Sequence, residues 1–124
     1  MFRFLGKIID TFLKLLYGPL AIFYDIVAWV VSRGDWYRWV FQIENYLQEN
    51  DKILEVGIGT GKLFNYLRES EYSVFGIDRS KQMLQITSSS KEINPKRLAR
   101  ADNLFLPFKS NSFDKLIASF PSEY

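Results

Sequence analysis

The chain has 124 residues, of which 48% are hydrophobic and 17% aromatic, and its formal net charge at pH 7 is +2. This composition supports one domain with a hydrophobic core and excludes a disordered chain, and the small net charge gives no basis for a nucleic-acid groove. The absence of cysteine and histidine excludes disulfides, zinc or iron–sulfur sites, and Ser-His or Cys-His nucleophiles. We therefore expect no metal site, and a cytoplasmic location is compatible with this composition.

The first predicted helix covers residues 2–17 and is amphipathic. Apolar residues recur three or four positions apart on one face, while basic residues such as Lys7 and Lys14 occupy the other. Two interpretations stay open. The helix either contacts a membrane interface, with its cations near lipid headgroups, or packs its apolar face on the domain.

Two more helices are predicted for residues 20–32 and 36–49, and Asp35 is well placed to cap the later one. A membrane span over residues 15–31 is rejected, because a Gly-Pro pair interrupts the run and Asp25 would lie inside the bilayer. A secretory signal also fits badly, because no uninterrupted apolar stretch leads to a small-residue cleavage site.

A short apolar run at residues 52–56 ends in three alternating glycines, Gly57, Gly59 and Gly61. This pattern predicts a buried strand that turns sharply into a helix over residues 62–70. Glycine tolerates positive φ and has no Cβ, so a bound molecule can press against the backbone. The first amide groups of the helix point at the same place, and we expect the ligand at this turn.

The glycine spacing differs from two similar phosphate-binding motifs. A P-loop requires a glycine and a hydroxyl residue at the positions where Val56 and Leu63 stand. The dinucleotide motif G-x-G-x-x-G requires a glycine in place of Lys62, which weakens that interpretation without excluding it. A tight turn that binds nothing also stays open.

A second β-rich run at residues 72–77 ends at Asp78. A right-handed strand-helix-strand unit places the ends of both strands side by side, so Asp78 is expected beside the glycine turn. A carboxylate 21 residues after Gly57 is suited to accept hydrogen bonds from both hydroxyls of a ribose. Capping of the helix that begins near Ser80 is a compatible second role.

The remaining sequence predicts two more strands. The helix after Ser80 ends near residue 88 in a serine-rich loop, and a third strand follows at residues 97–101. The fourth strand covers residues 113–119, after a turn-prone Lys-Ser-Asn-Ser segment.

Three segments resemble the class I S-adenosylmethionine-dependent methyltransferases. The acid-x-Gly-x-Gly-x-Gly pattern of residues 55–61 resembles their motif I, and residues 78–84 resemble the segment after their second strand. Asp102, Leu-Pro-Phe at residues 106–108 and Ser-Phe-Asp at residues 112–114 are similar to their third signature. The resemblance implies an α/β, Rossmann-like doubly wound parallel sheet, with its first four strands present here, and S-adenosyl-L-methionine as cofactor.

The resemblance also implies roles for the site residues. Asp78 would hold the ribose, Arg79 and Met83 would pack on the adenine, and Asp102 would accept a hydrogen bond from the adenine amino group. Glu55 would interact with the cofactor's amino group, and the three carboxylates would face one cleft. Met83 is equally compatible with ordinary helix core. The implied cofactor-binding residues are Glu55, Gly57, Gly59, Gly61, Asp78, Arg79, Met83, Asp102 and Asn103.

The N-terminal run resembles the helices that precede motif I in methyltransferases of the ubiquinone/menaquinone-biosynthesis type, where they cover the cofactor and shape the acceptor pocket. The resemblance thus divides the chain into a helical lid segment at residues 1–50 and a cofactor-binding half at residues 51–124. Candidate pocket residues are Tyr17, Tyr24, Trp36 and Pro121. Aromatic core filling explains the aromatic ones equally well. The apolar N-terminus favours a small or lipid-like methyl acceptor, and no catalytic residue is identified.

The family's domain has a seven-stranded sheet, and only four strands can be counted here. We expect either a shortened product or strands supplied from elsewhere, and the fourth strand would then present an edge open to self-association. The alternative function is a non-catalytic nucleotide-binding or membrane-associated module. An NAD-dependent oxidoreductase is disfavoured by Lys62 and by the two later matches.

Overall fold

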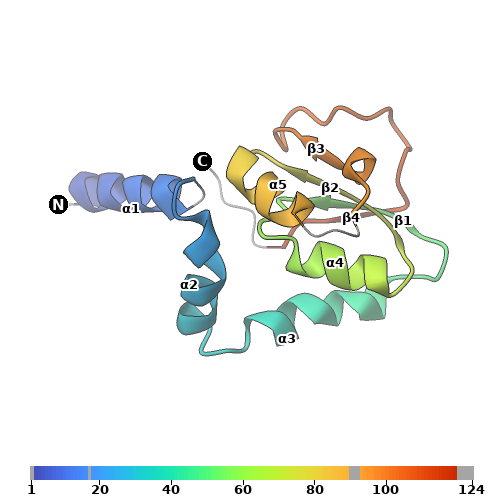
Figure 1. The fold of residues 1–124 in the computed structure, drawn as a ribbon, viewed down its shortest axis with the longest axis horizontal. Helices are drawn as coiled ribbons and strands as arrows, with labels where there is room; N and C mark the ends of the chain where they lie inside the picture. Colours follow the sequence, from blue (N-terminus) through green and yellow to red (C-terminus); the bar gives the residue numbers. More distant parts are fainter. Residues whose placement is uncertain (1, 17, 90–92, 120–124) are drawn as a thin grey trace.

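The computed structural model describes residues 2–16, 18–89 and 93–119, apart from the side chains of Phe2, Arg3, Trp36 and Trp39. A four-stranded parallel sheet with strand order β3-β2-β1-β4 forms its centre (Figure 1), which confirms the predicted fold class. The strands are β1 (Lys52–Val56), β2 (Ser73–Asp78), β3 (Leu98–Arg100) and β4 (Lys115–Ile117). The α-helices are α1 (Phe2–Leu16), α2 (Tyr24–Val31), α3 (Trp36–Phe41), α4 (Lys62–Glu69) and α5 (Lys81–Ser88). The 3-10 helices are η1 (Ala21–Phe23), η2 (Gln42–Tyr46) and η3 (Pro95–Arg97).

The strand ends meet at one edge of the sheet, as predicted. Helix α4 connects β1 to β2, and α5 leads from β2 toward β3, with parallel pairing throughout. The register pairs Val56 with Ile77 and Asp78 with Arg100. The carboxyl ends of β1, β2 and β3 therefore lie side by side, next to the glycine turn.

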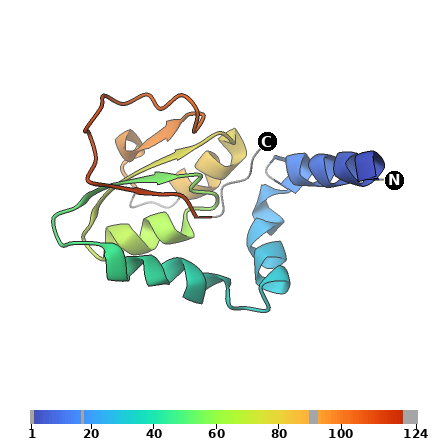
Figure 2. The same ribbon diagram turned by 180° about the vertical axis from the view of Figure 1, so that it is seen from behind.

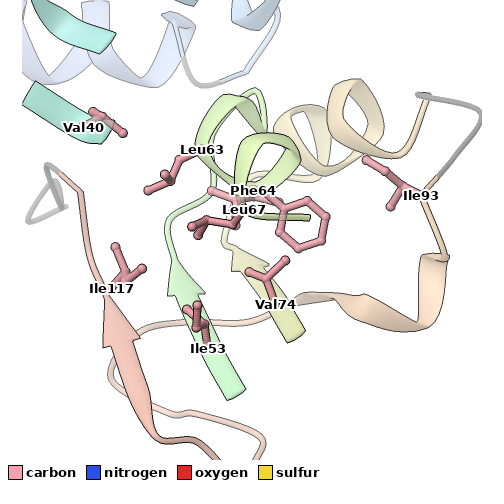
Figure 3. Packing of buried hydrophobic residues seen from close by; sticks show 9 residues of the cluster. Val40, Ile53, Leu63, Phe64, Leu67, Val74, Ile93 and Ile117 are labelled. Atoms are coloured by element: carbon pink, nitrogen blue, oxygen red, sulfur yellow. The ribbon is translucent and has the colours of Figure 1, made fainter. Parts of the chain in front are cut away.

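The larger core lies between the sheet and α4. Figure 3 shows Leu63, Phe64 and Leu67 of α4 close to Ile53 and Val74 of the two central strands. The three helix residues share one side because of their spacing, and alternate strand residues face them. Phe64 and Leu67 are completely buried, so this cluster contributes much of the hydrophobic stabilisation.

The opposite face of the sheet is covered by a loop. Leu54, Val56 and Ile77 form a second cluster there, against which residues of the β3–β4 connection pack. Phe108 and Phe113 of that connection meet edge to face, with 4.9 Å between ring centroids. Within the described part of the chain, this loop takes the place that a helix occupies on the other face.

The second and third predicted helices are each divided in two, because a 3-10 turn precedes α2 and another follows α3. The predicted cap at Asp35 is wrong. Its side chain makes no hydrogen bond to the helix backbone, and Oδ1 instead accepts from Arg38 Nη1 at 3.3 Å. A capping residue usually has an extended backbone, whereas Asp35 has helical angles of −82° and −5°.

Helix α1 points away from the sheet in both views (Figures 1 and 2). Its exposed apolar side chains are Phe4, Leu5, Ile8, Ile9, Phe12 and Leu15. Among the described side chains of α1, burial is confined to Leu16 at its end. The interpretation that the first helix packs its apolar face on the domain is therefore wrong for the described residues.

No single helix in the described ranges is long and apolar enough to cross a membrane. The segments Phe4–Leu16 and Ala21–Val31 meet the length and composition requirement only as a pair, and they are bent by 93°. The bend lies at the Gly-Pro pair that the sequence marks as a break.

Candidate functional site

The turn after β1 follows the sharp path that its glycines predict. Gly57, Gly59 and Gly61 have φ values of 73°, 55° and 80°, a region that glycine adopts most easily. The amides of Gly57 and Ile58 both donate to Ile77 O, at 2.8 and 3.1 Å. These two bonds fasten the turn to the end of β2.

Asp78 joins the glycine turn to the start of α5. Its Oδ2 accepts a hydrogen bond from Gly59 N at 2.9 Å, and its Oδ1 accepts one from Ser80 N at 2.7 Å. Burial raises the pKa of Asp78, and backbone hydrogen bonds from Ser80, Gly59 and Arg79 act in the opposite direction. Each carboxylate oxygen has a second acceptor position, so the group can hold the turn and still accept from a ligand hydroxyl.

A cavity of about 420 Å³ opens at this edge of the sheet. The predicted cofactor-binding residues that line it are Gly57, Gly59, Asp78, Arg79 and Asn103. The N-terminal segment contributes Leu13 of α1, Gly18 of the following turn and Tyr24 of α2, and Ser119 follows β4. The structure thus places residues from distant parts of the chain around one space.

Glu55 lies behind the cavity wall and is only 1% exposed. Burial, and secondly the negative charge of Asp78, raise the pKa of Glu55 to about 8. Among the described residues, its Oε2 has no hydrogen-bond partner. A buried carboxyl with an open oxygen therefore lies one residue before Val56, which lines the cavity.

Asp102 is partly exposed and does not line the cavity. Its Oδ1 accepts from Leu104 N at 3.0 Å, and its Oδ2 is 3.9 Å from Arg79 Nε. Asp102 thus faces the cavity through Arg79, which lines it. Three carboxylates were expected to face one cleft. Of these, Asp78 alone lines the cavity that the described residues form.

Gly61 and Met83 contribute to packing and do not line the cavity. A Cβ on Gly61 would lie 2.5 Å from Thr87 Cγ2 of α5, so the glycine allows the start of α4 to approach that helix. The Thr87 hydroxyl also donates to Gly59 O at 3.1 Å. Met83 is completely buried, as the helix-core interpretation predicts.

Tyr24 is the predicted pocket residue that the structure places at the cavity. Its Cε1 lies 4.0 Å from the position that a Cβ on Gly59 would take. Tyr17 and Pro121 lie outside the described residues. Trp36 begins α3, and its side chain is likewise outside the described part.

Several cavity residues carry no motif. Arg100 is the last residue of β3 and is paired with Asp78 of β2. Its position at a strand end is the signal that could have identified it as a cavity residue. Leu13 and Lys14 reach the cavity because of the bend that follows α1, and no local pattern predicts the direction of that bend.

A methyltransferase domain matches residues 54–123, which is more than half of the chain. A demethylmenaquinone methyltransferase of Symbiobacterium thermophilum is 29% identical over 115 residues, covering 85% of this chain and 45% of that protein. An uncharacterized methyltransferase of Bacillus thuringiensis is 36% identical over 69 residues, covering 55% of this chain and 31% of that protein. The crystal structure of a SAM-dependent methyltransferase from Methanosarcina mazei has 34% sequence identity and a TM-score of 0.53, covering 60% of this chain and 39% of that one.

The chain spans less than half the length of each of these relatives. One family match covers the glycine turn and the ends of the second and third strands together, as the resemblance predicts. It gives no support to the nicotinamide alternative. Because the match extends over more than half of its length, the chain belongs to the methyltransferase domain family.

Proposed function

We propose that this protein transfers a methyl group from S-adenosylmethionine to a small or lipid-like acceptor. The observation that carries the proposal is the cavity of about 420 Å³ that both the glycine turn and Asp78 line. We assign cofactor binding to residues 51–124 and a lid to residues 1–50. The proposed acceptor pocket residues are Tyr17, Tyr24, Trp36 and Pro121.

S-adenosylmethionine is the cofactor that the family membership implies, and the site fits it in three respects. A Cβ on Gly57 would meet nothing within 4 Å, so the backbone there faces open space. The cavity volume lies in the range of small-molecule sites. Asp78 offers acceptors for ribose hydroxyls, and Glu55 has an unused oxygen close by.

When bound, the cofactor supplies a methyl group that is already activated on a sulfonium centre. The protein then mainly has to hold the reactants in line and exclude water, so positioning is the main contribution. We assign Asp78 to the ribose hydroxyls and Arg79 and Asn103 to the adenine. Glu55 is assigned to the cofactor's amino group, whose positive charge favours the ionised carboxylate.

A lipid-like acceptor is supported by the apolar N-terminal helices and by one relative. Leu13, Gly18 and Tyr24 line the cavity from segments whose other apolar side chains are largely exposed. An apolar molecule can therefore pass along these helices to the cavity. The relative from Symbiobacterium thermophilum is named for demethylmenaquinone.

We also propose that the protein is cytoplasmic and membrane-peripheral, and that α1 contacts an anionic membrane surface. The apolar face of α1 is exposed, and Lys7 and Lys14 lie outside it. An amphipathic helix of this kind buries its apolar face at the acyl boundary while its cations stay near headgroups. Co-sedimentation with anionic vesicles is expected for the full chain and should drop after deletion of residues 1–16. Equal co-sedimentation of both chains contradicts this contact.

The outer edge of β4 is a second proposed contact, with another copy of the chain. Within the described residues β4 pairs with β1 alone, and Leu116 is exposed. An unpaired edge offers its amides and carbonyls to another strand. Sedimentation velocity should show association that increases with concentration and weakens in Leu116→Lys. A monomer at all concentrations contradicts it.

Calorimetric titration tests the proposed function directly. The full chain is titrated with S-adenosylmethionine and, in parallel, with NADH. We expect saturable binding of S-adenosylmethionine only. Binding of NADH alone overturns the assignment in favour of the nicotinamide alternative.

A further inference from the structure

Asp25, in the first turn of α2, connects the N-terminal helices to the glycine turn. Its Oδ1 accepts a hydrogen bond from Thr60 Oγ1 at 2.7 Å, and its Oδ2 lies 3.8 Å from Lys62 Nζ. Thr60 belongs to the glycine turn, and Lys62 is the first residue of α4. One carboxylate thus contacts both the turn and the helix that follows it.

The rest of α2 has little apolar anchoring. None of its described side chains is buried, and Trp29 and Val30 are 58% and 60% exposed. Ala21 of η1 is the buried residue closest to it in the preceding segment. Because apolar packing constrains α2 weakly, the polar contacts of Asp25 carry a large share of its attachment.

The turn that Asp25 contacts is itself firmly held. Gly59 N donates to Asp78 Oδ2 at 2.9 Å, and Gly59 O accepts from Thr87 Oγ1 at 3.1 Å. Thr60 follows directly. Asp25 therefore attaches α2 to a fixed point at the rim of the cavity.

Tyr24 precedes Asp25 and lines the cavity. Its Cε1 approaches the Gly59 backbone, 4.0 Å from the position of an added Cβ. Neighbouring residues of one helical turn move together, so the contact between Asp25 and Thr60 also fixes where the Tyr24 ring lies. Burial and the negative charge of Asp25 both raise the pKa of Tyr37, which shows that the carboxylate also acts on α3.

We propose that Asp25 is a positioning residue that holds α2 closed over the cavity and sets Tyr24 against the bound cofactor. Its contacts with Thr60 and Lys62 form a latch between the lid helices and the glycine turn. The inference rests on the proposed function, because it assigns the cavity to the adenosyl cofactor. Opening the latch lets the cofactor escape faster and leaves the core between α4 and the sheet unchanged.

The test compares Asp25→Ala, Thr60→Val and the double variant in the full chain, with S-adenosylhomocysteine as the probe. Each single variant is expected to release the probe about tenfold faster, the scale of one lost hydrogen bond to a charged group. The double variant should release the probe no faster than Asp25→Ala, because Asp25→Ala already lacks the contact with Thr60. Asp35→Ala is the control, since its exposed carboxylate pairs with Arg38 and is expected to leave release unchanged.

Hydrogen exchange of the α2 amides is measured in the same variants without any ligand. Faster exchange confined to α1 and α2, with unchanged exchange in β1 and α4, supports the latch. Unchanged α2 exchange in both single variants overturns it, and additive effects in the double variant overturn the direct coupling of Asp25 and Thr60. Absence of probe binding by the unsubstituted chain overturns the proposed function, and the exchange data still decide the latch.

Discussion

The two regions of this chain are held together in different ways. From β1 to α5, apolar side chains such as Phe64 and Leu67 are completely buried, and the turn between them is fixed by hydrogen bonds from several elements. In α1 and α2, most large apolar side chains are exposed, and the Asp25 contacts with Thr60 and Lys62 are prominent among the polar attachments. The first region owes its shape to its own core, whereas the second leaves most of its apolar surface exposed and is attached largely by polar contacts.

The largest expected effect is the difference in the free energy of unfolding between two phenylalanine substitutions, one in each region. Phe64 is 0% exposed and Phe4 is 70% exposed. Phe64→Ala should lower the free energy of unfolding by about 3 to 5 kcal/mol, because it removes buried area and leaves a cavity. Phe4→Ala should change it by less than about 0.5 kcal/mol. Urea denaturation measures both, and equal effects would remove the distinction between the regions.

Glu55 gives the core region a pH-dependent stability. Its pKa rises from 4.5 to about 8 on folding, so the folded state binds the extra proton between these values. The contribution of Glu55 protonation to the free energy of unfolding is therefore fully present below pH 4.5 and is lost as the pH rises toward 8. This loss amounts to a few kcal/mol, at about 1.4 kcal/mol per pKa unit. Glu55→Gln should flatten this decline in thermal unfolding measured from pH 5 to 8. A decline of the same size in Glu55→Gln contradicts the assignment.

Two glycines should respond to alanine with opposite signs. Gly61 has a φ of 80°, and an added Cβ would meet Thr87, so Gly61→Ala should cost about 1 to 3 kcal/mol of stability from the backbone alone. An added Cβ on Gly6 of α1 meets nothing within 4 Å. Gly6→Ala should therefore strengthen helix α1 by about 0.5 to 1 kcal/mol, visible as increased helicity in far-UV circular dichroism. A loss of helicity in Gly6→Ala contradicts the exposed position of α1.

An effect smaller than that of Gly61→Ala is expected at the helix starts of the two regions. Ser80 Oγ accepts from Met83 N at 3.2 Å and caps α5, so Ser80→Ala should cost about 1 kcal/mol. The Asp35 side chain makes no such bond to α3. Asp35→Ala should leave the chemical denaturation midpoint nearly unchanged. A midpoint shift as large as that of Ser80→Ala would show that Asp35 is a cap after all.

Local patterns predicted the core region well. The glycine spacing and the apolar runs predict the turn, the central strands and the place of Asp78, because these depend on backbone sterics and on parallel pairing. Chain topology alone brings Asp78 beside Gly59. A motif does not indicate which of its residues line the cavity. Gly61 packs against Thr87 and Met83 is buried, and neither residue lines the cavity.

The N-terminal helices were predicted as elements but not as an arrangement. The periodicity of α1 marks its apolar face without indicating what covers that face. The contact between Asp25 and Thr60 joins residues 35 positions apart. Thr60 lies within the glycine motif, but nothing in that motif indicates Asp25 as its partner. Such contacts depend on how α2 lies relative to the sheet, which the tertiary structure determines.

Cofactor affinity after substitution of Asp78 tests most directly whether this carboxylate holds the ribose of S-adenosylmethionine. Calorimetric titration with S-adenosylmethionine should show binding weakened by about 1 to 3 kcal/mol in Asp78→Ala, because ribose hydroxyls lose a buried partner. Asp51→Ala is the matched control, since Asp51 is another buried aspartate that accepts a backbone hydrogen bond, from Gln48 N at 2.8 Å, and does not line the cavity. We expect a loss of affinity in Asp78→Ala alone. Unchanged affinity in a folded Asp78→Ala protein would contradict it.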